Sequence, residues 1–202
     1  MSNVKLGGAM METLLSVAIG LGLSAACGFR VFVPLLMTGV TSATGHLRLA
    51  QDFQWMASTP ALVTFSTATA AEILAYYIPW LDHFLDLLAT PTAILAGVIA
   101  SASVITELPP LVKWSVALIA GGSIAGIVQG TTVLTRVKSS ALTGGLGNFL
   151  VSTLELAGSI VTAFLAIFVP LACLAILAAT LWYVLRKAGR LVFGRRKVNR
   201  SV

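Results

Sequence analysis

Two glutamates, Glu72 and Glu155, are the residues of this sequence best suited to chemistry, because each lies inside a long apolar run. Such a run is typical of a membrane-spanning helix, whose rise of about 1.5 Å per residue places both carboxylates near the middle of the bilayer. A charge there is costly unless it is paired or hydrated. The pair therefore predicts a proton-carrying or cation-binding site facing the interior of a helix bundle. The alternative is two structural carboxylates, protonated or bridged to a neighbouring helix.

Arg30 and Arg136 are the natural partners of these carboxylates. Each follows a stripe of small residues near a predicted membrane face, and a guanidinium can bind a carboxylate with two hydrogen bonds. An Arg–Glu pair in each half of the chain would satisfy both charges. An arginine at a helix end can instead extend to the lipid headgroups, and for Arg136, close to Lys138, this alternative is equally strong.

Further polar residues accompany both glutamates. Asn148 and Ser152 precede Glu155 and share a helical face, and Thr67 and Thr69 precede the glutamate of the first half in the same way. These residues predict a small polar cavity between the second and fifth spans. The alternative is that the hydroxyl groups bond back to their own helices, which is common in membranes.

An acidic segment follows the second span. Asp82 and Asp86 are four residues apart, and the apolar side chains around them turn elsewhere, which predicts a short interfacial amphipathic turn. The apolar residues are Leu81, Phe84, Leu85 and Leu88. The same spacing around His83 is weak evidence for a divalent metal, and we expect no metal site.

The composition defines the class of protein. The 202 residues are 57% hydrophobic and 10% charged, and the mean hydropathy is +0.96, which predicts an all-α polytopic membrane bundle in a single membrane domain, 1–202. About six transmembrane helices fit. Their predicted bounds are 13–38, 58–79, 89–106, 112–134, 146–168 and 170–186. The first span is long enough to bend, and the residues where a break is most plausible are Gly20, Gly22, Gly28 and Pro34. We expect this span to be retained and not cleaved as a secretory signal.

Charge placement predicts the orientation in the membrane. With six spans, one face collects most of the Lys and Arg residues, and the other has Arg48 and Lys113. This asymmetry predicts a bacterial-type inner-membrane protein with both termini in the cytoplasm. The basic tail, 188–202, belongs to a cluster suited to anionic lipid, so the net charge of +6 predicts membrane lipid as a partner and no nucleic acid.

A faint internal repeat divides the chain into halves 12–106 and 112–187. The segment from Arg30 to Gly39 aligns without a gap with the segment from Arg136 to Gly145, sharing Arg-Val, a Leu and the final Gly. Three spans per half would make the second half inverted relative to the first, an architecture common in secondary transporters. Chance similarity between two low-complexity apolar segments is the alternative.

Enzyme motifs are absent from the sequence. There is no nucleophile elbow, phosphate loop or zinc-ligand spacing, and Cys27 and Cys173 lie alone in apolar runs, where inert buried thiols are expected. We therefore expect no enzyme activity and no cofactor.

Three stretches of the sequence resemble the bacterial membrane family catalogued as domain of unknown function 4126. They are CGFRVFVPLL, AEILAYYIPWLDHFLDLLATPTAILAG and TRVKSSALTGGLGNFLVSTLELAGS. Residues that match the family pattern are Glu72, Ile78, Pro79, Asp82, Asp86 and Pro91. The chain departs from the pattern at Tyr76 and Tyr77, where the family has Asp-Lys, and at Leu156, where an acidic pair is usual. The resemblance implies an inner-membrane protein and no particular activity.

These features together favour a small transporter or channel-like protein for a small solute, ion or lipid. A structural or assembly protein, whose polar groups only join helices, is the second interpretation, and a lipid-modifying enzyme is the third. The small-residue stripe at Gly122, Gly126 and Gly130 would also suit a homodimer contact.

Overall fold

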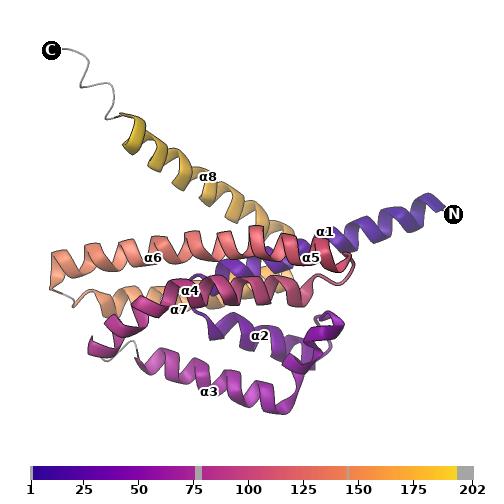
Figure 1. Cartoon of the computed structure of the whole chain (residues 1–202), viewed down its shortest axis with the longest axis horizontal. Coiled ribbons are helices and arrows are strands. Elements are labelled where there is room, and N and C mark those ends of the chain that lie inside the picture. The colour runs from indigo at the N-terminus through magenta and orange to yellow at the C-terminus, as the bar shows by residue number, and fades with distance from the viewer. Residues whose placement is uncertain (1, 76–78, 145, 195–202) are drawn as a thin grey trace.

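The chain folds as an all-α bundle (Figure 1). The computed structural model describes the backbone of 2–75, 79–144 and 146–194, and side chains within 7–75, 88–144 and 146–183 and at Arg186. The helices are α1 (Ser2–Cys27), α2 (Phe32–Ala43), the 3-10 helix η1 (Gln51–Ala57), α3 (Thr59–Ala75), α4 (Pro79–Val104), α5 (Pro110–Val116), the π-helix η2 (Ala117–Gly121), α6 (Gly122–Thr143), α7 (Asn148–Phe168) and α8 (Pro170–Gly194).

Several of these helices have the length and hydropathy of membrane spans. Within the described residues, three segments are long and apolar enough to cross a bilayer: Gly7–Cys27, Pro110–Thr143 and Asn148–Phe168. Shorter apolar helices are Phe32–Ala43, Leu88–Val104 and Pro170–Tyr183. The expected class, an all-α membrane bundle, is thus confirmed.

The predicted first span, 13–38, is two helices and not one. α1 ends at Cys27 and α2 begins at Phe32. The break falls at Gly28, one of the expected positions, where a Cβ would lie 2.6 Å from Cβ of Val128 and 2.7 Å from the carbonyl oxygen of Ala125. Only glycine lets the turn approach α6 this closely. Pro34 does not break the chain, because it lies in the first turn of α2, where a missing N–H is tolerated.

α1 forms the centre of the bundle and packs against α4, α6, α7 and α8. Small residues make these contacts possible, as in other membrane bundles. Ser24 donates a hydrogen bond of 2.7 Å to the carbonyl oxygen of Gly97 on α4, and Gly22 lies against Ala166 on α7.

Two helices extend beyond their predicted bounds. α4 begins at Pro79 and continues through Pro91, so the predicted acidic turn is the first part of a long helix, while the side chains of Asp82 and Asp86 lie outside the described residues. α5, η2 and α6 follow one another without a loop from Pro110 to Thr143. The polar residues after 134 therefore do not end the helix, and Arg136 lies within it.

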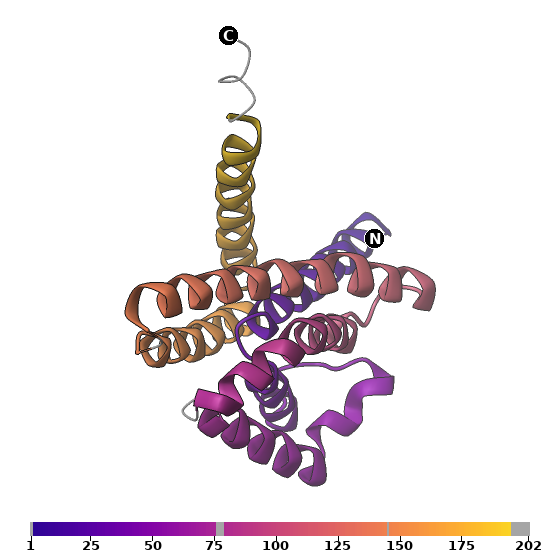
Figure 2. The same cartoon turned by 60° about the vertical axis from the view of Figure 1, so that its left-hand side comes forward.

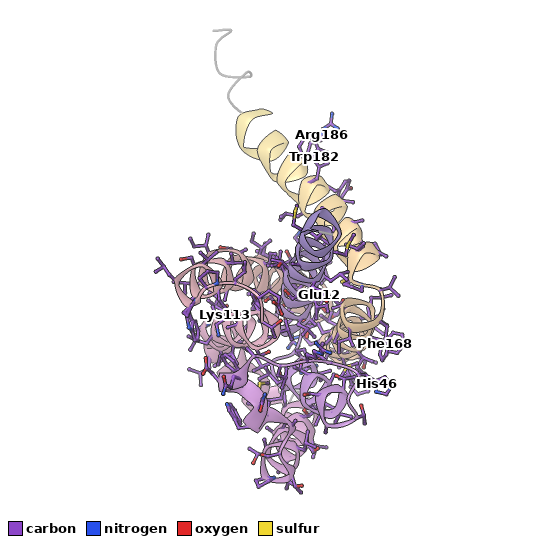
Figure 3. All side chains as sticks on the ribbon, turned by 90° about the vertical axis from the view of Figure 1, so that its right-hand side faces the viewer. Glu12, His46, Lys113, Phe168, Trp182 and Arg186 are labelled. Atoms are coloured by element: carbon purple, nitrogen blue, oxygen red, sulfur yellow. The ribbon has the colours of Figure 1, made fainter. Side chains whose placement is uncertain are left out.

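α8 leaves the bundle after its first turns. Figures 1 and 2 show it projecting at an angle from the other helices, and its early contacts are with α1 and α7. Trp182 and Arg186 lie on the projecting part (Figure 3). The start of α1 and the end of α8 lie at opposite ends of the long axis in Figure 1.

Candidate functional site

A buried ion pair joins α6 to α7. Nε of Arg136 donates a hydrogen bond of 2.9 Å to Oε1 of Glu155, and Nη2 of the same guanidinium contacts Oε2. Nη2 also donates to the hydroxyl oxygen of Ser152 at 3.1 Å. Arg136 is 3% exposed and Glu155 is 6% exposed. Arg136 thus points into the bundle, and the alternative in which it extends to the headgroups does not apply.

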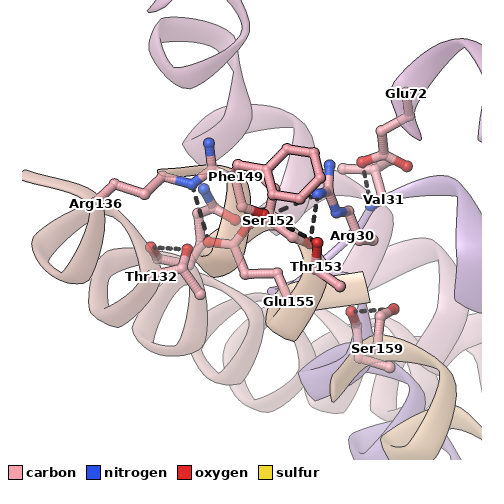
Figure 4. Close-up of polar contacts among 12 residues, drawn as sticks. Arg30, Val31, Glu72, Thr132, Arg136, Phe149, Ser152, Thr153, Glu155 and Ser159 are labelled. Carbon is pink, nitrogen blue, oxygen red and sulfur yellow. Dashed lines mark hydrogen bonds and ion pairs between the residues drawn. The ribbon is translucent and has the colours of Figure 1, made fainter. Parts of the chain in front are cut away.

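Arg30 reaches the same carboxylate from the turn between α1 and α2 (Figure 4). Its Nη2 donates a hydrogen bond of 2.9 Å to the carbonyl oxygen of Ser152 and lies 3.9 Å from Oε2 of Glu155. Arg30 is 2% exposed. Two guanidinium groups, one from each predicted half of the chain, therefore meet at one carboxylate and one serine of α7.

Glu72, near the end of α3, holds the start of α2. Its Oε1 accepts a hydrogen bond of 2.9 Å from the backbone N–H of Val31, and Oε2 accepts one of 3.1 Å from that of Phe32. The first N–H groups of a helix lack partners within the helix and carry partial positive charge. The carboxylate of Glu72 supplies both the missing hydrogen-bond acceptors and a compensating negative charge.

The turn that carries Arg30 lies deep in the bundle. Ser159, near the middle of α7, donates a hydrogen bond of 3.0 Å to the carbonyl oxygen of Ala26, and Gly28 packs against Val128 of α6. Arg30, Arg136, Glu72 and Glu155 make up two positive and two negative groups around this turn, and we call these four residues the charge cluster. Its formal charges balance, which limits the cost of burial.

The predicted site residues do not all come together. Asn148 lies at the start of α7 and pairs with Ser140 of α6, with its Nδ2 2.9 Å from the serine Oγ. Ser152 does contact the charge cluster, through both its hydroxyl and its carbonyl group. Sequence reasoning missed the amides of Val31 and Phe32, which have no side-chain signal. A broken span beside a membrane glutamate is the pattern that could have indicated them.

The space expected to be a polar cavity between the second and fifth spans is occupied. α2 packs against both α3 and α7, so the carboxylates of Glu72 and Glu155 approach the α1–α2 turn from different helices (Figure 4). A polar hollow of about 480 Å³ lies instead at the other end of α2. Its lining includes Ser42, Arg48, Gln54 and Glu107.

The fold and the charge cluster define an α-helical membrane protein with a buried ionic centre. The chain belongs to the family described as "Domain of unknown function (DUF4126)", whose family model matches residues 17–190. The resemblance seen in the sequence is therefore confirmed. Neither the search of curated proteins nor the search of solved structures found a match.

Proposed function

We propose that this chain is a small transporter or channel-like protein for a small solute, ion or lipid. The observation that carries the proposal is the break between α1 and α2, which presents the first amides of α2 to a carboxylate inside the bundle. Broken helices whose ends face charged groups at membrane depth are a recurring feature of transporter sites. Non-helical backbone at this depth is tolerated where it is buried in protein or lines a cavity.

The charge cluster could couple the position of α2 to proton or cation binding at Glu72. Protonation of Glu72, or binding of a cation to it, would weaken the two hydrogen bonds that hold the start of α2. α2 would then be free to shift relative to α3, while Arg30 remained joined to Ser152 and Glu155. In this proposal Glu72 is the responsive carboxylate, and Glu155 is the fixed one.

The polar hollow supplies one end of a route. α2 begins at the charge cluster and ends beside the hollow at Ser42, a length of about 18 Å for 12 residues. Thr38 lies between these ends and is fully buried, with its hydroxyl bonded to the carbonyl oxygen of Pro34. The route is therefore closed along α2 in this structure, and movement of α2 is the step that would open it.

Solvent access to the cluster tests this proposal. Ser152→Cys, made in a Cys27→Ser, Cys173→Ser background, places a thiol against the charge cluster and keeps both carboxylates. A membrane-impermeant thiol reagent is applied from each side of the membrane, with Ala100→Cys as the dry control because Ala100 is fully buried on α4. Thr106→Cys is the exposed control. Labelling at 152 well above that at 100 supports an aqueous route; equal, negligible labelling of a folded protein contradicts it.

A structural or assembly role is the second candidate, and the closed cluster favours it. The contacts of Arg30, Arg136 and Ser152 tie the α1–α2 turn, α6 and α7 together, as polar groups do when they only join membrane helices. This role predicts no labelling at 152 and loss of assembly when the cluster is broken. Our proposal includes no catalytic reaction and no cofactor.

The proposed location is a bacterial-type inner membrane, crossed several times, with halves 12–106 and 112–187 forming an inverted repeat. Seven basic residues from Arg186 onward support a cytoplasmic position for the end of α8. The sequence-based proposal has the N-terminus on that side too, whereas Figure 1 shows the start of α1 and the end of α8 at opposite ends of the long axis. A reporter fused in turn to each terminus decides this: activity on the same side supports the proposal, and activity on opposite sides overturns it.

A further inference from the structure

An apolar groove of about 250 Å³ lies between α6 and α8, where α8 diverges from the bundle. Its walls are mostly aliphatic, and its lining includes Ile127, Val128, Leu177 and Ala178. Phe29, from the α1–α2 turn, also lines the groove. The exposed positions of Ile127 and Ala178 open it to the outside of the bundle, where a membrane protein meets lipid.

We propose that this groove binds one acyl chain of an anionic phospholipid. The lining has almost no polar surface, with Thr131 and Thr180 as its hydroxyl residues, so it matches a hydrocarbon chain and not a hydrated solute. Thr180 bonds its hydroxyl back to the carbonyl oxygen of Ile176, and Thr131 does the same to that of Ile127. Neither hydroxyl therefore requires a polar ligand.

Positive charge beyond the groove selects an anionic headgroup. Lys138 is exposed and follows Thr131 by seven residues on α6, which places it on the same helix face two turns further on. On α8, the exposed aromatic residues Trp182 and Tyr183 follow directly after the last lining residue, Leu181. Such rings mark the headgroup level. Arg186, which is exposed on α8, comes next, so the groove leads from the hydrocarbon region toward Lys138 and Arg186.

The groove also adjoins the α1–α2 turn through Phe29, which lines it. Phe29 precedes Arg30 in the chain, and its ring lies about 3.6 Å from the position of a Cβ on Gly158 of α7. A chain in the groove would pack against this ring, which also lies near α7. Bound lipid would therefore brace the α1–α2 turn, whatever the function of the cluster.

Photo-crosslinking in vesicles tests the proposal. The probe is a phosphatidylglycerol with a diazirine in one acyl chain, present in phosphatidylcholine vesicles that contain the full-length protein. We expect saturable labelling of Phe29 and of the lining residues on α6 and α8, which unlabelled phosphatidylglycerol competes at least fivefold better than added phosphatidylcholine. Labelling spread without saturation over all the exposed apolar faces would overturn the proposal. Exclusion of the probe by a second copy of the chain, seen as labelling of the groove that falls as the protein forms dimers, would also overturn it.

Two variants separate the groove from the fold. Ala178→Trp fills the groove at an exposed position and should lower the labelling of Phe29 at least tenfold; the matched variant Leu154→Trp, on an exposed face of α7, should leave it unchanged. Lys138→Gln keeps the apolar lining intact and should remove most of the preference for phosphatidylglycerol. Elution volume and melting temperature establish that each variant folds. An unchanged preference in Lys138→Gln, or equal labelling in Ala178→Trp and Leu154→Trp, contradicts the proposal.

Discussion

Arg136 of α6 and Glu155 of α7 form a bidentate ion pair, in which one guanidinium binds both carboxylate oxygens of Glu155. The same carboxylate lies 3.9 Å from Arg30. Glu155 is thus shared by two buried cations, and each arginine has a further contact with Ser152. Loss of Glu155 should therefore be more damaging than loss of either arginine.

Replacement of Glu155 by Leu should lower the free energy of unfolding by about 3–5 kcal/mol, because it leaves buried positive charge without its counter-charge. Arg136→Leu should cost less, since Arg30 remains near the carboxylate. The double variant Arg136→Leu, Glu155→Leu should be more stable than Glu155→Leu alone. Equilibrium unfolding in detergent micelles measures all three, and losses that simply add in the double variant would contradict the coupling.

Glu72→Ala should loosen the start of α2 without unfolding the bundle. Two backbone N–H groups lose their acceptor, which costs about 1–3 kcal/mol when the groups stay buried. Hydrogen exchange at the amides of Val31 and Phe32 should accelerate strongly in Glu72→Ala and less in Glu72→Gln, which keeps one acceptor oxygen. Glu12→Ala, at an exposed position of α1, is the control. Exchange equally slow in Glu72→Ala and Glu12→Ala would show that Glu72 does not hold α2.

The sequence was sufficient to predict the class of fold and several members of the site. Hydropathy alone identified the apolar helices, because a membrane segment needs a long uncharged run. The rarity of charge within those runs identified Glu72, Glu155, Arg30 and Arg136. In the structure Arg136 binds Glu155, Arg30 binds Ser152, and Glu72 binds the first amides of α2. These contacts agree with the expectation that intramembrane charges have partners.

The details of pairing could not be predicted, for a physical reason. A break in a helix depends on tertiary contacts such as that of Gly28 with Val128. The hydropathy of the sequence carries no information about such contacts. The same break exposes backbone amides that bind the carboxylate of Glu72. Glu72 is then engaged by these amides, while Arg30 and Arg136 both bind Ser152 of α7. Asn148 shares a face with Ser152 in the sequence, yet its nearest partner is Ser140 on the neighbouring helix.

Gly97→Ala should destabilise the bundle, whereas Gly130→Ala should not. A Cβ at Gly97 would lie 2.5 Å from Cβ of Ala125 and 3.1 Å from the carbonyl oxygen of Gly121, and overpacking of this kind costs about 1–3 kcal/mol. A Cβ at Gly130 has no atom within 4 Å, and alanine is favoured over glycine in a helix by about 1 kcal/mol. Melting temperatures in detergent should therefore move in opposite directions, and a fall of equal size in both variants would contradict this packing.

Lys113 should stabilise the bundle more through its stem and its aromatic neighbours than through its ion pair. Its Nζ lies 3.4 Å from Oδ2 of Asp52, but the Asp52 side chain is 75% exposed, so solvent weakens that pair. The same Nζ lies 5.7 Å from the ring centroid of Phe53 and 5.9 Å from that of Trp114. Asp52→Asn should therefore lower the free energy of unfolding by less than about 1 kcal/mol.

Lys113→Ala should lower it by about 2 kcal/mol, because both the buried stem and the cation–π contacts are lost. Lys113→Met keeps most of the stem, so its loss in the free energy of unfolding should lie between those of Asp52→Asn and Lys113→Ala. Thermal unfolding of the three variants in one detergent, at low and at high salt, provides the measurement. The ranking should persist at high salt, since a largely buried stem does not depend on screening. An Asp52→Asn loss as large as that of Lys113→Ala would instead assign the stabilisation to the ion pair.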